Sequence, residues 1–177
     1  NKKLTEKTIS SETIFQSRFL NIVRDQVRLP DGRVGQREYI LHPGAAVILP
    51  VLETGEIVLV EQYRQPLKQI FLELPAGKKD PGEQPETAAH RELLEETGYT
   101  AGKLELMTVI HPTIGYANEV MHLYKATELV AGLQQLDHGE FLELKKFTSN
   151  QLKEKVKKGE ITDVKTLVGL FWHWGFS

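Results

Sequence analysis

Residues 45–52 read AAVILPVL, and this run limits the folds that are open to the chain. The run is continuous and apolar, and turn signals bound it, with His42-Pro43-Gly44 before it and Glu53-Thr54-Gly55 after it. A short apolar run without polar alternation is typical of a strand that is buried on both faces. The rest of the chain must therefore cover this strand from two sides.

The remaining patterns indicate what those covering layers are. Residues 56–63 follow the buried run after a tight turn and are its expected antiparallel partner. Further strands are expected at about 19–29, 34–41, 70–74, 104–110, 120–126 and 141–147, and helices at about 85–97, 150–158 and 163–174. This order is not a regular βαβ alternation, and it predicts a mixed α/β architecture with helices packed on a sheet.

The first 42 residues predict a small β element of their own. The turn Pro30-Asp31-Gly32 would join the two N-terminal strands into a hairpin. Because a lone hairpin can hardly bury a core, we expect residues 1–42 to pack on the main domain, residues 43–177, or on a second subunit. A homodimer is the resulting hypothesis.

Composition excludes several classes of protein. The 177 residues fit one globular unit, and the net charge of −2 argues against a nucleic-acid partner held by bulk positive charge. The absence of cysteine excludes disulfides, zinc–thiolate sites and thiol nucleophiles. There is no apolar run of 18 residues and no signal-like apolar stretch at the start, so we expect no membrane partner and a cytoplasmic protein.

The expected helix at 85–97 is unusually acidic. Pro85 suits its first position and Gly98 suits the left-handed residue just past its end. From residue 80 to 96 there are six acidic side chains and one basic side chain, which leaves a net charge of −5. Glu92 and Glu96 share one face, four residues apart, and Glu95 lies beside them.

A solvated acidic face is the ordinary interpretation of such a helix, but two penalties argue against it here. Like charges four residues apart repel, and Glu92, Glu95 and Glu96 fall in the last turns, near the negative end of the helix dipole. A divalent cation would reverse both penalties. Carboxylate oxygens favour Mg²⁺, or Mn²⁺, over zinc. Because such ions usually bind through a few carboxylates together with substrate phosphates, we expect chemistry on a diphosphate.

The segment from Gly77 to Tyr99 resembles the Nudix box, G-x5-E-x7-R-E-U-x-E-E-x-G-U, in which U is a bulky aliphatic residue. The matching positions are Gly77, Glu83, Arg91, Glu92, Leu93, Glu95, Glu96 and Gly98. Tyr99 departs from the pattern, as an aromatic residue in place of an aliphatic one. The resemblance implies an α/β/α sandwich that cleaves a nucleoside diphosphate linked to another moiety.

The same resemblance implies roles for the acidic positions. Glu92 and Glu96 would be the main metal ligands, and Glu95 a further ligand or a contact through water. Glu83 would be an auxiliary carboxylate. Arg91 would orient a box glutamate, and Glu95, four residues on, is within its reach.

The segments EQYRQP, LELPAGK and GEFLEL resemble the ADP-ribose pyrophosphatase branch of that family. The branch implies hydrolysis of ADP-ribose to AMP and ribose 5-phosphate. It implies metal contacts from the Ala76 carbonyl and from Glu140. It also implies that Arg64 contacts the nucleotide or its diphosphate, and that Arg37 reaches the substrate of a partner subunit, as domain swapping is usual there.

For several of these residues the ordinary interpretation stays open. Arg64 and Arg37 would then make surface ion pairs, and Glu73, which resembles a site glutamate of the branch, would be structural. Ile114 stands where the branch often has proline, and His138 where it commonly has a general-base glutamate. The base is therefore left among His138, Asp137 and a box glutamate.

Two other functions remain as alternatives. Another nucleoside diphosphate sugar, such as a GDP- or UDP-sugar, is the alternative substrate. A Nudix module that senses nucleotides without cleaving them is a less favoured function, because every acidic box position is filled.

Overall fold

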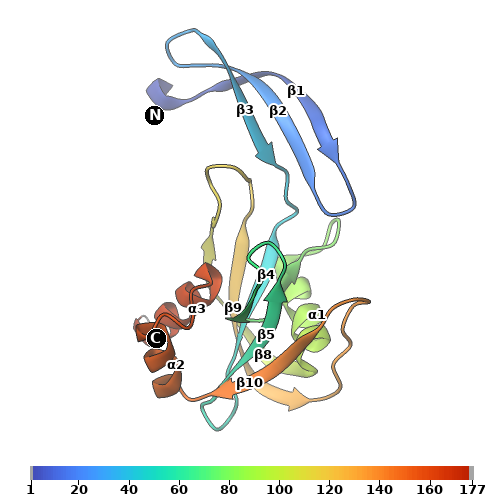
Figure 1. The fold of residues 1–177 in the computed structure, drawn as a ribbon, viewed down its shortest axis with the longest axis vertical. Coiled ribbons are helices and arrows are strands. Elements are labelled where there is room, and N and C mark those ends of the chain that lie inside the picture. Colours follow the sequence, from blue (N-terminus) through green and yellow to red (C-terminus); the bar gives the residue numbers. More distant parts are fainter. Residues whose placement is uncertain (1, 176–177) are drawn as a thin grey trace.

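The computed structural model describes residues 2–175 and shows a mixed α/β fold (Figure 1). The strands are β1 (Lys7–Gln16), β2 (Asn21–Arg28), β3 (Val34–Ile40), β4 (Ala45–Pro50), β5 (Ile57–Arg64), β6 (Gln69–Glu73), β7 (Ala76–Lys78), β8 (Tyr99–Ile110), β9 (Met121–Ala131) and β10 (Leu142–Phe147). The helices are α1 (Pro85–Thr97), α2 (Ser149–Lys157) and α3 (Val164–Gly175), and a 3-10 turn, η1 (Lys2–Leu4), precedes β1.

Strand β4 is buried on both faces, as its sequence predicts. It lies inside a sheet of order β7-β4-β9-β8, parallel to β9 and antiparallel to β7. Ala46 and Ile48 pack toward α1, whereas Val47 and Leu49 pack into a second core on the other face. Figure 1 shows α1 and the α2–α3 pair on opposite sides of this sheet. The α/β/α layering expected for the fold is confirmed.

The expected pairing of β5 with β4 is wrong. The two strands share only an isolated bridge, between Val51 and Ile57. Both edges of β4 are already occupied by β7 and β9, so β5 enters a second sheet of order β10-β5-β6. Leu59 of β5 packs there with Leu152 of α2 and Leu170 of α3.

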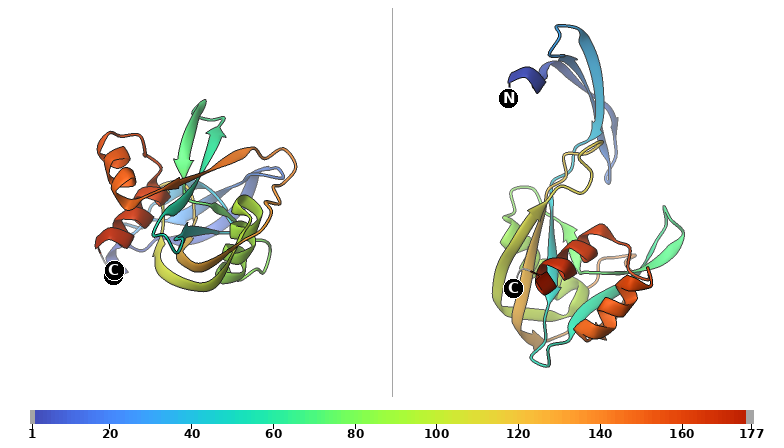
Figure 2. Two further views of the ribbon diagram at one scale, coloured as in Figure 1. Left: turned by 90° about the horizontal axis from the view of Figure 1, so that it is seen from below. Right: turned by 90° about the vertical axis from the view of Figure 1, so that its left-hand side faces the viewer.

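The N-terminal element is a three-stranded sheet, not the expected hairpin. Strand β1 adds to β2, on the opposite side from β3, and all pairs are antiparallel. All ten residues of β1 are exposed, and the sheet stands apart from the main body (Figure 2). The backbone of Ile40 ties it to the body through Tyr116 O, 2.9 Å from Ile40 N, and Asn118 N, 3.2 Å from Ile40 O.

Within residues 2–175, no helix combines the length and the apolar character that a membrane crossing requires.

Candidate active site

Helix α1 begins and ends at the residues that its sequence predicts. Pro85 occupies its first turn, and Gly98 follows it with φ 71°, donating its N–H to Leu94 O at 2.8 Å. This left-handed position suits glycine because other residues pay a steric cost there. The buried face of the helix carries apolar residues together with Glu92 and Glu96, which are 9% and 4% exposed.

Arg91 connects the acidic side chains. Its Nε and Nη2 donate to Glu83 at 3.0 and 2.9 Å, and its Nη1 donates to Glu92 at 2.6 Å and to Glu95 at 2.9 Å. Nη2 also donates to Lys78 O at 2.9 Å. All five N–H groups of the guanidinium are therefore used. The expected contact with Glu95 is confirmed, and Glu83 and Glu92 join it.

The start of the box fits closely against the two buried glutamates. A Cβ at Gly77 would lie 1.9 Å from the carboxylate of Glu92, so any side chain at this position would displace that carboxylate. The neighbouring Ala76 donates its backbone N–H to Glu96 Oε2 at 3.0 Å. Strand β7, which the sequence did not indicate, thus holds both carboxylates from the other side.

Burial and mutual repulsion shift these two carboxyl groups toward the neutral form. Burial raises the pKa of Glu92 to about 7 and the pKa of Glu96 to about 8. The charge of Glu140 raises both values further, so this residue lies near the pair although it is 44 positions beyond Glu96. The structure therefore places Glu92, Glu96 and Ala76 beside one another, whereas Glu140 acts on the two glutamates only through its charge.

This set of donors fits a hard divalent cation. Its members are carboxylate oxygens, and Arg91 alone cannot neutralise the negative charge that they carry when ionised. Among residues 2–175, no three His, Asp or Glu side chains converge as a ready-made cage. Mg²⁺ commonly binds through one or two carboxylates and completes its shell with water and substrate phosphates, so an open arrangement suits it.

A second cluster borders a hollow of about 210 Å³ that Ala76 and Gly77 also line. In it, Arg64 Nε and Nη2 each donate to the carboxylate of Glu73 at 2.7 Å. Glu73 is 3% exposed, whereas the Arg64 side chain is 44% exposed. Arg64 and Glu73, which the sequence analysis named separately, thus lie together beside the box as an ion pair.

Two further residues of this cluster were missed by the sequence analysis. Lys165 Nζ donates to Glu73 Oε2 and to Asp163 Oδ2, the latter at 2.9 Å. An aspartate directly before a helix is a common N-cap, and this signal could have identified Asp163. No local signal could have paired Lys165 with Glu73, 92 positions away.

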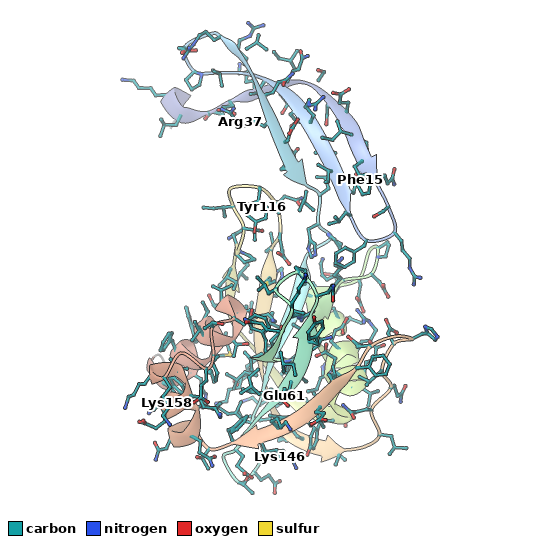
Figure 3. All side chains as sticks on the ribbon, in the orientation of Figure 1. Phe15, Arg37, Glu61, Tyr116, Lys146 and Lys158 are labelled. Carbon is teal, nitrogen blue, oxygen red and sulfur yellow. The ribbon has the colours of Figure 1, made fainter. Side chains whose placement is uncertain are left out.

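Arg37 does not join either cluster. It binds Glu6, with its Nε 3.0 Å from Glu6 Oε2, and lines a separate hollow of about 370 Å³ between the N-terminal sheet and residues 114–118. Figure 3 shows Arg37 on this sheet, above the loop that carries Tyr116. Ile114 lines the same hollow and is exposed, and His138 is exposed in the turn that precedes Glu140.

Comparison with known proteins agrees with this geometry. The NUDIX domain family matches residues 41–167, and the nucleoside diphosphate sugar hydrolase N-terminal domain matches residues 6–40. An ADP-ribose pyrophosphatase of Bacillus subtilis is 41% identical over 167 residues, covering 93% of this chain and 90% of that protein. A methanol dehydrogenase activator of Bacillus methanolicus is 39% identical over 174 residues, covering 96% and 92%. The crystal structure of an ADP compounds hydrolase superposes with a TM-score of 0.85 at 22% identity, covering 98% and 95% of the two chains.

Proposed function

Because this chain belongs to the Nudix hydrolase family, we propose that it hydrolyses the diphosphate of ADP-ribose to AMP and ribose 5-phosphate. One observation carries the proposal: Glu92 and Glu96 are buried side by side, held by Arg91 and Ala76, with Glu140 nearby. The 41% identity to an ADP-ribose pyrophosphatase supports this choice of substrate.

The divalent cation, Mg²⁺ or Mn²⁺, would be held by Glu92, Glu96, Glu140 and the carbonyl of Ala76, with Glu95 as a further contact. When bound, it would neutralise phosphate charge and activate water for attack on phosphorus. Ionised Glu92 and Glu96 would then be stabilised by the cation, although their burial favours the neutral form in its absence.

The chain's own residues would orient the reacting groups. Arg91 fixes Glu92 and Glu95 through charge-assisted hydrogen bonds, with Glu83 holding the other edge of its guanidinium. Arg64, half exposed at the hollow beside Ala76, would contact the diphosphate. The proton of the attacking water would pass to a box glutamate, to Asp137 or to His138.

We also propose that the chain acts as a homodimer through its N-terminal element, residues 1–42. Strand β1 exposes Ile9, Ile14 and Phe15, and its sheet, of order β1-β2-β3, contains no strand from residues 43–177. Arg37 lies on the same sheet, away from the box, and would meet the substrate of the second subunit. Light scattering tests this part: a dimeric mass is expected, and a monomeric mass at assay concentration contradicts it.

A panel of nucleotide sugars tests the substrate. ADP-ribose is expected to give the highest kcat/KM in Mg²⁺, above GDP-mannose and UDP-glucose. The alternative, a GDP- or UDP-sugar, is kept because the exposed Ile114 stands where the branch often has proline. A higher kcat/KM for one of those would replace ADP-ribose as the substrate. Tight binding of ADP-ribose without turnover would instead support a nucleotide-sensing module.

A further inference from the structure

The buried lysine of helix α3 has no part in the chemistry described so far. Lys165 is 6% exposed, and its ammonium binds Glu73 and Asp163. Burying an ammonium group costs free energy unless the group is paired and hydrogen-bonded. Its position beside the candidate active site therefore suggests a function for Lys165.

We propose that Lys165 is a positioning residue for substrate binding, which acts through Glu73 to hold the guanidinium of Arg64 at the hollow beside Ala76. The inference rests on the proposed function only in taking the occupant of that hollow to be a nucleoside diphosphate sugar.

Hydrogen bonds connect helix α3 to Arg64 through the carboxylate of Glu73. Glu73 accepts two hydrogen bonds from Arg64 and one from Lys165, which leaves its carboxylate with three donors. Burial alone would raise the pKa of Glu73, but the two cations hold it below the usual value. Glu73 therefore stays ionised, and an ionised carboxylate presents two oxygens to the planar guanidinium.

The far end of the chain of contacts is anchored in the fold. Asp163 Oδ2 accepts from Lys165 and from the backbone N–H of Thr166 at 3.1 Å, which caps α3. The hydroxyl of Thr166 donates to Asp163 at 2.6 Å and accepts from Leu74 N at 2.7 Å. Lys165 is thus fixed to the segment that directly precedes the box, and its position is transmitted to Arg64 through Glu73.

The cluster also lies directly beside the start of the box. Arg64, Asp163 and Lys165 line the hollow of about 210 Å³ together with Ala76, the residue that binds Glu96. The same three residues and Glu73 border a second hollow, of about 420 Å³, with Phe71 and Leu67. Arg64 is the more exposed of the two cations, so it is the one that substrate would meet.

Nuclear magnetic resonance of the arginine Nε–Hε groups tests the positioning directly and needs no substrate. In ¹⁵N-labelled protein, the Arg64 signal, assigned by its loss in Arg64→Lys, should be sharp and slow to exchange with water. Lys165→Met should broaden it or speed its exchange, and Lys165→Arg should largely restore it. Leu170→Ala, a buried truncation on the same helix, is the control for lost stability and should leave this signal sharp.

A double-mutant cycle tests the consequence for binding. Lys165→Met and Arg64→Ala should each raise KM for ADP-ribose by about tenfold, and the double variant should raise it no further, because coupled residues are not additive. Lys155→Met, which removes a surface ammonium paired with Glu160, is the matched control and should leave KM unchanged. Lys165→Gln replaces the methionine variant if that variant does not fold.

The outcomes separate this inference from the proposed function. An unchanged Arg64 signal in Lys165→Met, or additive effects on KM, would overturn the role of Lys165 even if ADP-ribose is hydrolysed. Absence of turnover in the wild type would overturn the proposed function, while a selective change in the Arg64 signal would still support the positioning role.

Discussion

The glutamate site on α1 and the β1–β3 sheet differ in how completely their side chains are bonded and buried within a single chain. At the site, Arg91 uses all five N–H groups and the carboxylates of Glu92 and Glu96 are buried against β7. On the sheet, β1 is exposed throughout, and Arg37 donates to Glu6 and to Gln36 O, which both belong to the N-terminal element. One chain therefore holds the glutamates of α1 in place by itself, whereas the role proposed for Arg37 would require a second subunit.

Glu96→Gln should have the largest effect. The amide can still accept the hydrogen bond of Ala76 N, but it cannot supply the charge that a divalent cation requires. We expect kcat for ADP-ribose to fall by about 10³-fold, in the range found for loss of electrostatic stabilisation of the transition state. Steady-state kinetics at saturating Mg²⁺ measure this, and full retained activity would remove Glu96 from the metal site.

Gly77→Ala should come next, through packing alone. The new Cβ would lie 1.9 Å from the Glu92 carboxylate and must displace it. Because small misplacements at a reacting centre can cost about 10²-fold, we expect kcat to fall by about that factor. Gly175→Ala is the matched control, since a Cβ there meets nothing within 4 Å. Equal activity in both variants would show that the position of Glu92 is not critical.

Arg37→Ala tests whether the N-terminal sheet takes part in substrate binding. If Arg37 binds substrate across a dimer, its loss should raise KM for ADP-ribose by about tenfold, or roughly 1.4 kcal/mol, with kcat little changed. Arg33→Ala, in the turn between β2 and β3 and paired with Asp31, is the control. An unchanged KM for Arg37→Ala would confine recognition, like chemistry, to residues 43–177.

The sequence predicted the α1 site far better than the N-terminal sheet, and local signals explain why. Pro85 and Gly98 mark both ends of α1, and a four-residue spacing places Glu95 within reach of Arg91. Strand β1, KTISSETIFQ, carries no buried alternation that would reveal it. It forms by pairing with β2, and pairing is not encoded in a strand that no core covers.

Contacts between distant segments were out of reach for the same reason. Glu73 and Lys165 meet because α3 packs beside β6, where Gly169 lets the helix approach so closely that a Cβ would lie 2.5 Å from Leu74. The pairing of β5 was mispredicted because β7, a three-residue strand, occupies the edge of β4. Neither fact follows from local pattern.

The smallest expected effect is on the thermal stability of the metal-free protein. The pKa of Glu96 is raised from its ordinary value to about 8, so its stabilising contribution is present below about pH 4.5 and is lost as pH rises through 8. Metal-free Glu96→Gln should therefore gain about 2–4 °C in Tm over the wild type at pH 8.5, with no gain near pH 4.5. Thermal unfolding of the two proteins in a chelator, at both pH values, measures this. A difference that does not vary with pH would contradict the burial of an ionisable Glu96.

Phosphorus NMR of the wild-type protein with ADP-ribose observes the metal-dependent cleavage of the diphosphate itself. With Mg²⁺, the diphosphate signals should be replaced by those of AMP and ribose 5-phosphate, and excess chelator should abolish the change. Persistence of the diphosphate signals in Mg²⁺ or Mn²⁺, or hydrolysis that survives the chelator, would contradict a metal-dependent diphosphatase built on the glutamates of α1.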